Sequence, residues 1–160
     1  QFDHLGVHFK PAPLKKYERV VTKADAYAEE NQYPDTALGA DKSAGHVVDI
    51  LRCTFVVPSP EVAVALCEWF DKATVEAVGF RPLRRKNGFH SEAKVVGGYR
   101  DIKYNVLFKS PALATASDAA AAGGTRLSSC IAEVQILLSS FLVVKERCHA
   151  VYKLHRGDFG

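Results

Sequence analysis

The chain has 160 residues, of which 48% are hydrophobic and 24% are charged, and its formal net charge is +3. This size and composition predict one soluble globular domain with a single core. The net charge is too small to indicate nucleic-acid binding by itself. No run of residues approaches the roughly 18 apolar residues of a membrane-spanning helix, and the amino terminus lacks the order of a signal peptide. We therefore expect an intracellular protein without a membrane partner.

The chain begins at Gln1 and contains no methionine, so we expect an excised domain whose partners include other domains of a longer protein. Its four cysteines are widely separated, which favours reduced, partly buried thiols over a zinc site or a disulfide framework. The sequence also lacks the Gly-x-x-x-x-Gly-Lys-Ser/Thr, Gly-x-Gly-x-x-Gly and His-Glu-x-x-His motifs. The commonest nucleotide-binding and zinc enzymes are therefore disfavoured.

Residues 13–30 are predicted to form the first helix, because a proline suits its first turn and apolar residues recur at helical spacing. Lys15, Arg19 and Lys23 follow at intervals of four, which would stack three cations along one side. Like charges at that spacing repel each other, so the row suits a bound anion. A solvated basic stripe fits the spacing equally well. Residues 31–45 are predicted to be a loop.

Residues 47–57 are predicted to form a buried strand, because they are rich in β-branched and apolar side chains. Asp49 and Arg52 interrupt this strand. Alternation would place the two side chains on opposite faces, so both could serve one site only if the strand begins late or bulges.

Ser59-Pro60-Glu61 is typical of a helix start, and the amphipathic pattern predicts a helix of about five turns that ends near residue 78. Trp69 is predicted to belong to the core. Residues 80–90 follow as a basic strand or arm, and a loop that holds Lys94 leads to the next strand.

Residues 99–109 are predicted to form a strand with strict alternation between apolar and polar side chains. Its apolar face carries Ile102, Tyr104, Val106 and Phe108. Its polar face carries Tyr99, Asp101, Lys103 and Asn105. Residues 110–127 are low in complexity and predict a surface insertion.

Residues 129–138 are predicted to form the last strand, with Glu133 and Gln135 on one face. A final helix is predicted from about Ser139 to His155, with its apolar residues facing the sheet. These apolar residues are Leu142, Val143, Cys148 and Val151. The elements together predict an α+β domain with a mixed sheet of about four or five strands flanked by helices.

Asp49 and Glu133 lie in predicted strand interiors, where an unpaired charge is costly. Proteins usually hold Mg²⁺ through one or two carboxylates together with phosphate oxygens, so this pair is a candidate metal site. The alternative is that each carboxylate forms a structural ion pair with a nearby lysine or arginine. Phosphoryl transfer depends on positioning, cations and metal rather than on a covalent group. Tyr99, beside a glycine pair, could stack on a nucleobase.

These segments, in this order, resemble the synthetase domain of the RelA/SpoT family. Gly98-Tyr99-Arg100-Asp101-Ile102-Lys103 is similar to the family's Gly-Tyr-x-Ser-Ile/Leu-His strand, and Glu133-Val134-Gln135-Ile136 to its Glu-x-Gln-Ile strand. His149-Ala150-Val151-Tyr152-Lys153 then resembles part of the helix that follows. The chain departs from the family at Asp101, which replaces serine, at Lys103, which replaces histidine, and at Leu137-Leu138, which replaces Arg-Thr.

The resemblance implies one synthetase domain over residues 1–160, with a nucleotidyltransferase-like fold. It implies transfer of pyrophosphate from ATP to a hydroxyl of a nucleotide or of an RNA 3′ end. Asp49, Glu133 and Gln135 would form the catalytic centre, with Mg²⁺ held by the two carboxylates. ATP and its phosphates would be bound by Lys15, Arg19, Lys23, Arg52 and Lys94. The acceptor would be bound by Tyr99, Arg100, Lys103 and His149.

Two alternatives remain open at this point. The departures from the family favour a catalytically degenerate domain that binds nucleotides or serves as a scaffold in a larger protein. Asp101 in particular would repel an acceptor pyrophosphate, which argues against a guanine nucleotide as the acceptor. A simple RNA-binding module would instead show steep salt dependence and no need for magnesium.

Overall fold

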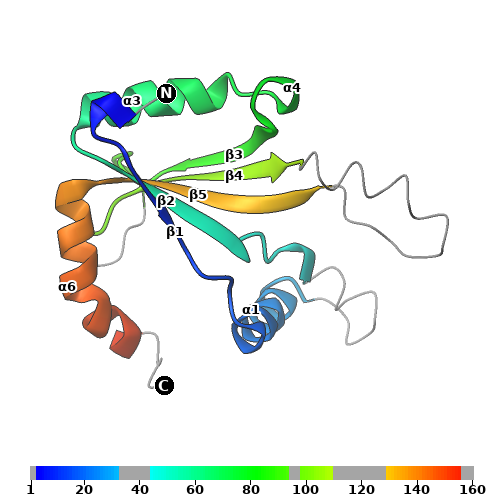
Figure 1. Cartoon of the computed structure of the whole chain (residues 1–160). Helices are drawn as coiled ribbons and strands as arrows, with labels where there is room; N and C mark the ends of the chain where they lie inside the picture. The colour runs from blue at the N-terminus through cyan, green and yellow to red at the C-terminus, as the bar shows by residue number, and fades with distance from the viewer. Residues whose placement is uncertain (1–2, 33–43, 94–97, 110–128, 156–160) are drawn as a thin grey trace.

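The computed structural model describes residues 3–32, 44–93, 98–109 and 129–155 (Figure 1), and within 148–155 it describes the backbone alone. The predicted insertion at 110–127 and the predicted phosphate-binding residue Lys94 lie outside these ranges. Most of the predicted loop at 31–45 lies outside them as well.

A mixed five-stranded sheet forms the centre of the domain, in the order β1-β2-β5-β4-β3 (Figure 1). Strands β2 and β5 run parallel, and the other neighbouring pairs run antiparallel. The strands are β1 (His8–Pro11), β2 (Leu51–Val57), β3 (Phe80–Asn87), β4 (Ile102–Phe108) and β5 (Cys130–Leu138). The predicted α+β class and the predicted mixed sheet are therefore confirmed.

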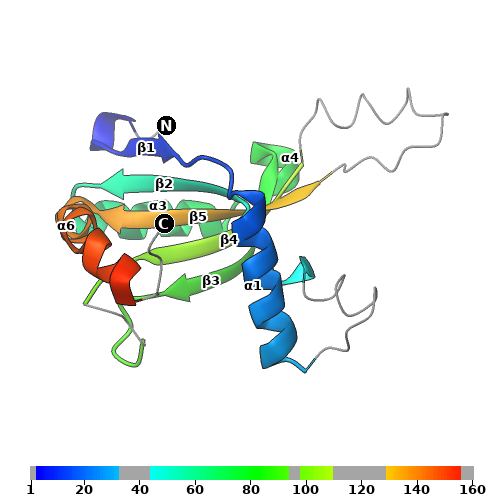
Figure 2. The ribbon, with the colours of Figure 1, turned by 90° about the horizontal axis from the view of Figure 1, so that it is seen from below.

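Helices cover both faces of this sheet. Figure 1 shows α3 on one face, and Figures 1 and 2 show α1 and α6 on the other face, near opposite ends of the strands. The helical elements are η1 (Asp3–Leu5), α1 (Tyr17–Glu30), α3 (Pro60–Asp71), α4 (Val75–Val78) and α6 (Ser139–His155). Among the described residues, no helix combines the length and the apolar character that crossing a membrane requires.

The core lies between α3 and the apolar face of the sheet. Phe70 of α3 is 2% exposed, and its ring stacks on that of Tyr104, which is fully buried, with 5.1 Å between the ring centroids. Trp69 packs against this core from a partly buried position, and its ring contacts Phe70 and Phe80. Alternation along β4 and β5 supplies most of the remaining core. These residues are Val106, Ala132, Val134 and Ile136.

The helix predicted from residue 59 to residue 78 begins where expected, but its predicted length is wrong. Ser59 caps the start, since its side chain accepts a hydrogen bond from the backbone N–H of Val62. The helix then ends at Asp71, because Thr74 adopts an extended conformation and caps a separate helix by accepting a hydrogen bond from Ala77. A threonine that bonds the backbone in this way competes with helix continuation.

The prediction of the first helix is wrong in its start. It begins at Tyr17, because residues 12–15 run beside the start of β2 and donate backbone hydrogen bonds from Ala12 to Arg52 and from Lys15 to Ile50, both 3.1 Å long. Its predicted apolar side is largely exposed, with Tyr17 at 77%. Strand β1 was not predicted, because its four residues are all exposed and carry no apolar pattern. On α6, Val143 is 47% exposed rather than packed on the sheet.

The described cysteines agree with the prediction of reduced thiols. Cys53, Cys67 and Cys130 are free. Burial raises the pKa of the Cys53 thiol to about 11, so this side chain stays protonated at neutral pH.

The hydroxyl of Tyr104 ties β4 to the end of α3. It lies 2.9 Å from Asp71 Oδ1 and 3.3 Å from the Cys67 carbonyl oxygen, and Arg85 of β3 pairs with the same aspartate. We expect Tyr104→Phe to lower the free energy of unfolding by about 1–2 kcal/mol, because it removes a hydrogen bond to a charged group while keeping the ring. Urea denaturation measures this change.

Tyr17→Phe is the matched control, because Tyr17 is exposed on α1. It should change the free energy of unfolding by less than about 0.5 kcal/mol. Equal stability of Tyr104→Phe and the wild type would show that the hydroxyl does not hold α3 in place.

Candidate functional site

The face of the sheet opposite α3, here called the polar face, lies between α1 and α6 (Figure 2). The strand register arranges its side chains in two rows across the sheet, because paired residues point to the same side. The row nearer α1 contains Arg52, Glu133, Asn105 and Arg84. The row nearer α6 contains Lys10, Thr54, Gln135, Lys103 and Lys86. Several of the predicted site residues therefore share one surface.

Asp49 lies just before β2, which begins at Leu51, so the prediction of a strand from residue 47 is wrong. A late start of this strand was one of the two conditions under which Asp49 and Arg52 could serve the same site. The carboxylate is a meeting point for two lysines: Lys15 Nζ and Lys23 Nζ each lie 2.8 Å from Asp49 Oδ2. Lys15 precedes α1, so the predicted helical stack of three cations does not form.

The environment of Asp49 keeps it ionised. Burial alone would raise its pKa, but the hydrogen bonds and charges of Lys15 and Lys23 outweigh burial and hold the pKa below its ordinary value. The second oxygen, Oδ1, is buried and has no hydrogen-bond partner among the described residues. Buried acceptors without partners are rare in proteins, so the unfilled oxygen favours a ligand at this position. Its chemistry suits a hard cation such as Mg²⁺.

Glu133 has different surroundings. Gln135 Nε2 donates a hydrogen bond to Glu133 Oε1 at 2.9 Å, and Lys145 Nζ of α6 donates to Gln135 Oε1 at 3.2 Å. Within the described ranges no lysine or arginine forms an ion pair with Glu133. Among the described residues, the structural ion-pair alternative therefore applies to Asp49 and not to Glu133.

Tyr99, Asp101 and Lys103 form a second polar cluster at the α6 end of this face. The Tyr99 hydroxyl donates to Asp101 Oδ2 at 3.0 Å, and Lys103 Nζ lies 3.3 Å from the same oxygen. Asp101 is 6% exposed. The charge expected to repel an acceptor pyrophosphate is thus countered by a neighbouring ammonium group. Lys145 Nζ lies 5.5 Å from the centroid of the Tyr99 ring, within the range of a cation–π contact.

Lys145 is the residue of this site that the sequence did not indicate. It links the Glu133–Gln135 pair to the Tyr99 cluster, and burial lowers its pKa. A single lysine in a helix carries no motif, so only the packing of α6 reveals it. It also lines a hollow of about 370 Å³ beside β1 and β2. The other lining residues are Lys10, Thr54, Leu142 and Glu146.

Three of the predicted site residues are not among those that form the contacts described above. Arg19 is exposed on α1, one turn before Lys23. Arg100 donates hydrogen bonds to the carbonyls of Gly88 and His90, at 2.7 and 3.4 Å, and so braces that loop. The side chain of His149 lies outside the described residues, and its role in acceptor binding stays a prediction.

Gly88 is constrained by this site, because a Cβ there would lie 2.6 Å from the carbonyl oxygen of Asp101. The close approach allows the Gly88 N–H to donate to that oxygen at 2.8 Å. The contact holds the chain immediately after β3 against the residues that precede β4.

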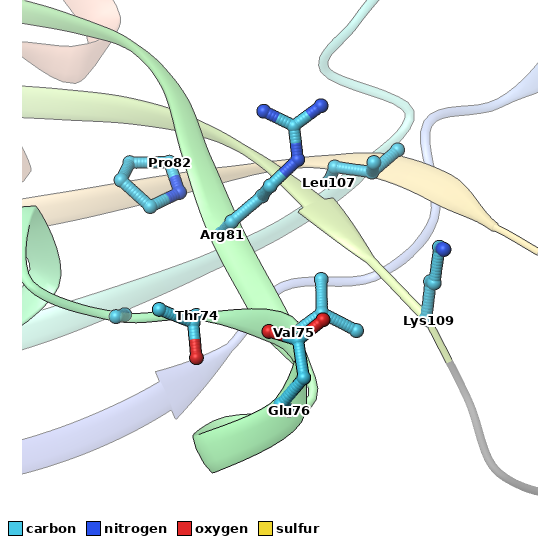
Figure 3. Close-up of a pocket in the computed structure, with 8 residues that line it drawn as sticks. Thr74, Val75, Glu76, Arg81, Pro82, Leu107 and Lys109 are labelled. Carbon is cyan, nitrogen blue, oxygen red and sulfur yellow. The ribbon is translucent and has the colours of Figure 1, made fainter.

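A separate pocket of about 440 Å³ lies at the α4 end of β3 and β4 (Figure 3). It is lined by Ala73, Thr74, Val75, Glu76, Arg81, Pro82, Leu107 and Lys109. None of the predicted site residues belongs to this lining. The candidate site is therefore the polar face and not this pocket.

No protein-family model and no curated protein matches the sequence. Solved structures do match. The chain is similar to small alarmone synthetase 1 of Bacillus subtilis bound to its product pppGpp, with 14% identity, a TM-score of 0.61, and coverage of 91% of this chain and 62% of that one. A GTP pyrophosphokinase family protein of Streptococcus pneumoniae gives 14% identity, a TM-score of 0.65, and coverage of 96% and 62%.

Small alarmone synthetase 2 of Bacillus subtilis gives 14% identity, a TM-score of 0.61, and coverage of 96% of this chain and 66% of that one. The chain thus spans slightly less than two thirds of the length of these proteins. The structural similarity shows the shared fold, and at this level of identity the chemistry has to be argued from the site. The sheet and its flanking helices have the RelA/SpoT-like fold of the small alarmone synthetases.

Proposed function

We propose that this domain transfers the β,γ-pyrophosphate of ATP to a hydroxyl of a nucleotide or of an RNA 3′ end. The acceptor hydroxyl oxygen attacks the β-phosphorus and loses its proton to water, the bond between this phosphorus and the oxygen bridging to the α-phosphate breaks, and AMP leaves with that oxygen. A GTP pyrophosphokinase family protein and a small alarmone synthetase bound to its product pppGpp are among the proteins that share the fold. The proposal extends that activity to this chain from its own residues.

The observation that carries the proposal is the placement of two complementary clusters on the polar face. Lys15 and Lys23 provide ammonium groups beside Asp49 at the start of β2. Tyr99 lies toward α6 beside Lys145, and Glu133 lies in the row of side chains nearer α1, opposite Arg52. Cations at one end suit the phosphates of ATP, and an aromatic ring at the other suits an acceptor base.

Each residue then has a defined task. Lys15 and Lys23, with Arg19 and Arg52 nearby, hold the phosphates and counter their charge. Asp49 and Glu133 would hold Mg²⁺, which supplies charge stabilisation to the transferring group when bound. Gln135 fixes the Glu133 carboxylate through its amide. Tyr99 stacks on the acceptor base, while Lys103 and Lys145 keep the surrounding charge positive.

A second candidate function is a nucleotide-binding or scaffolding module that has lost catalysis. The double ion pair of Asp49 favours it, because both lysines assigned to phosphates pair with a carboxylate of the protein itself. The two candidates differ in turnover and agree on nucleotide binding, so an assay of transfer separates them.

Glu133→Gln should reduce pyrophosphate transfer by at least about a hundredfold, because it removes a charge from the metal site while keeping the shape of the side chain. The assay follows label from β- or γ-labelled ATP, with magnesium, into GMP, GDP, GTP, AMP, ADP, ATP and transfer RNA. Glu68→Gln, on the exposed side of α3, is the matched control and should retain full activity.

Full activity of Glu133→Gln would show that Glu133 does not belong to the catalytic site. A folded wild-type protein that labels none of these acceptors would favour the non-catalytic module. A labelled product that disappears in Glu133→Gln identifies the acceptor.

Lys145→Met should raise the KM for the acceptor by about tenfold and leave the KM for ATP within about twofold, because Lys145 contacts Tyr99 and not the Asp49 cluster. Lys145→Arg should restore part of the loss, since it keeps the charge. Lys72→Met, at the exposed end of α3, is the control. A larger effect on ATP than on the acceptor would contradict this placement.

A further inference from the structure

We infer that Asp49 makes the phosphate site selective for the metal-bound form of its nucleotide, by holding Lys15 and Lys23 until a divalent cation replaces them. The inference deepens the proposed function and rests on it. Asp49 acts here as a specificity-determining residue, in addition to its part in binding metal.

Asp49, Lys15 and Lys23 pair with one another. Both ammonium groups contact the same carboxylate oxygen, Oδ2, at 2.8 Å. The side chains are 13% exposed for Asp49, 14% for Lys15 and 34% for Lys23. Charges this sheltered interact strongly, because little water screens them.

A nucleotide without metal meets a barrier in this arrangement. If its phosphates draw both lysines away, the Asp49 carboxylate is left buried with no partner from the described residues on either oxygen, since Oδ1 has none among them. An uncompensated buried charge is strongly unfavourable. If the lysines instead bridge the two groups, phosphate oxygens lie close to a carboxylate, and these like charges repel.

A divalent cation without nucleotide meets the opposite barrier. Two lysines and one aspartate give the cluster a net charge of +1 (two positive charges minus one). A cation that binds at Oδ1 is repelled by both ammonium groups. Asp49 can accept it fully only when the lysines move to another anion, such as a phosphate.

Metal and nucleotide together remove both barriers. The lysines exchange Asp49 for phosphate oxygens, and Asp49 exchanges the lysines for the cation, so no charge is left uncompensated. The two ligands must therefore strengthen each other's binding by the same factor. Glu133 does not take part in this exchange, because no described lysine or arginine pairs with it.

The first test measures ATP binding by calorimetry, with Mg²⁺ and with EDTA, for the wild type and Asp49→Asn. The wild type should bind ATP at least about tenfold more weakly in EDTA. Asp49→Asn should bind ATP in EDTA about fivefold or more tightly than the wild type does in EDTA, with little gain from Mg²⁺. Asp25→Asn, exposed on α1, removes the same charge and should behave as the wild type.

The reciprocal test measures Mn²⁺ binding without nucleotide, by electron paramagnetic resonance. Lys23→Met should bind Mn²⁺ about fivefold more tightly than the wild type, because one competing cation is gone. Lys16→Met, an exposed lysine just before α1, should leave Mn²⁺ binding unchanged. Lys23→Met keeps the inference testable if circular dichroism shows that Asp49→Asn does not fold.

The outcomes separate this inference from the proposed function. Equal ATP affinity of the wild type in Mg²⁺ and in EDTA would overturn the inference and leave the proposed function standing. Unchanged Mn²⁺ binding in Lys23→Met, or no gain of metal-free ATP affinity in folded Asp49→Asn, would overturn it as well. A wild type that binds ATP in neither condition would refute the proposed function and the inference together.

Discussion

The parallel pairing of β2 with β5 positions the rest of the candidate site. Its register sets Arg52 opposite Glu133 and Thr54 opposite Gln135, which places the start of β2 beside the acidic residue of β5. The residues before α1 are in turn hydrogen-bonded to the start of β2, so Lys15 reaches Asp49. The central pair needs a crossover between its strands, and α3 within that crossover covers the apolar face.

The polar face distributes charge unevenly along the strands. At the α1 end, two lysines contact one oxygen of Asp49, and the other oxygen has no hydrogen-bond partner in the described part of the chain. Glu133, opposite Arg52, has an amide partner and no ion pair among the described residues. Toward α6, Asp101 is countered by Lys103. This division gives the two candidate metal ligands different behaviour in the same site. Asp49 must exchange partners before a cation binds fully, and Glu133 need not.

Sequence patterns predicted the strands best where burial is one-sided. The alternation in β4 and β5 follows from a sheet with an apolar face under α3 and a polar face opposite, so the shared direction of Glu133 and Gln135 was predictable. Helix boundaries were less predictable. The end of α3 depends on a cap at Thr74, and the late start of α1 depends on hydrogen bonds from residues 12–15 to β2. Local spacing contains neither contact.

The sequence by itself determined the α+β class, the polar face and the kinds of side chain available for phosphate and metal binding, because alternation and residue chemistry are local properties. Only the tertiary structure decided which charges meet. Lys15 and Lys23 converge on Asp49 through contacts between segments distant in sequence, and Lys145 reaches Tyr99 and Gln135 because α6 packs over the polar face. Electrostatic interactions depend on separation in space and on shelter from water, and neither quantity can be read from spacing along the chain.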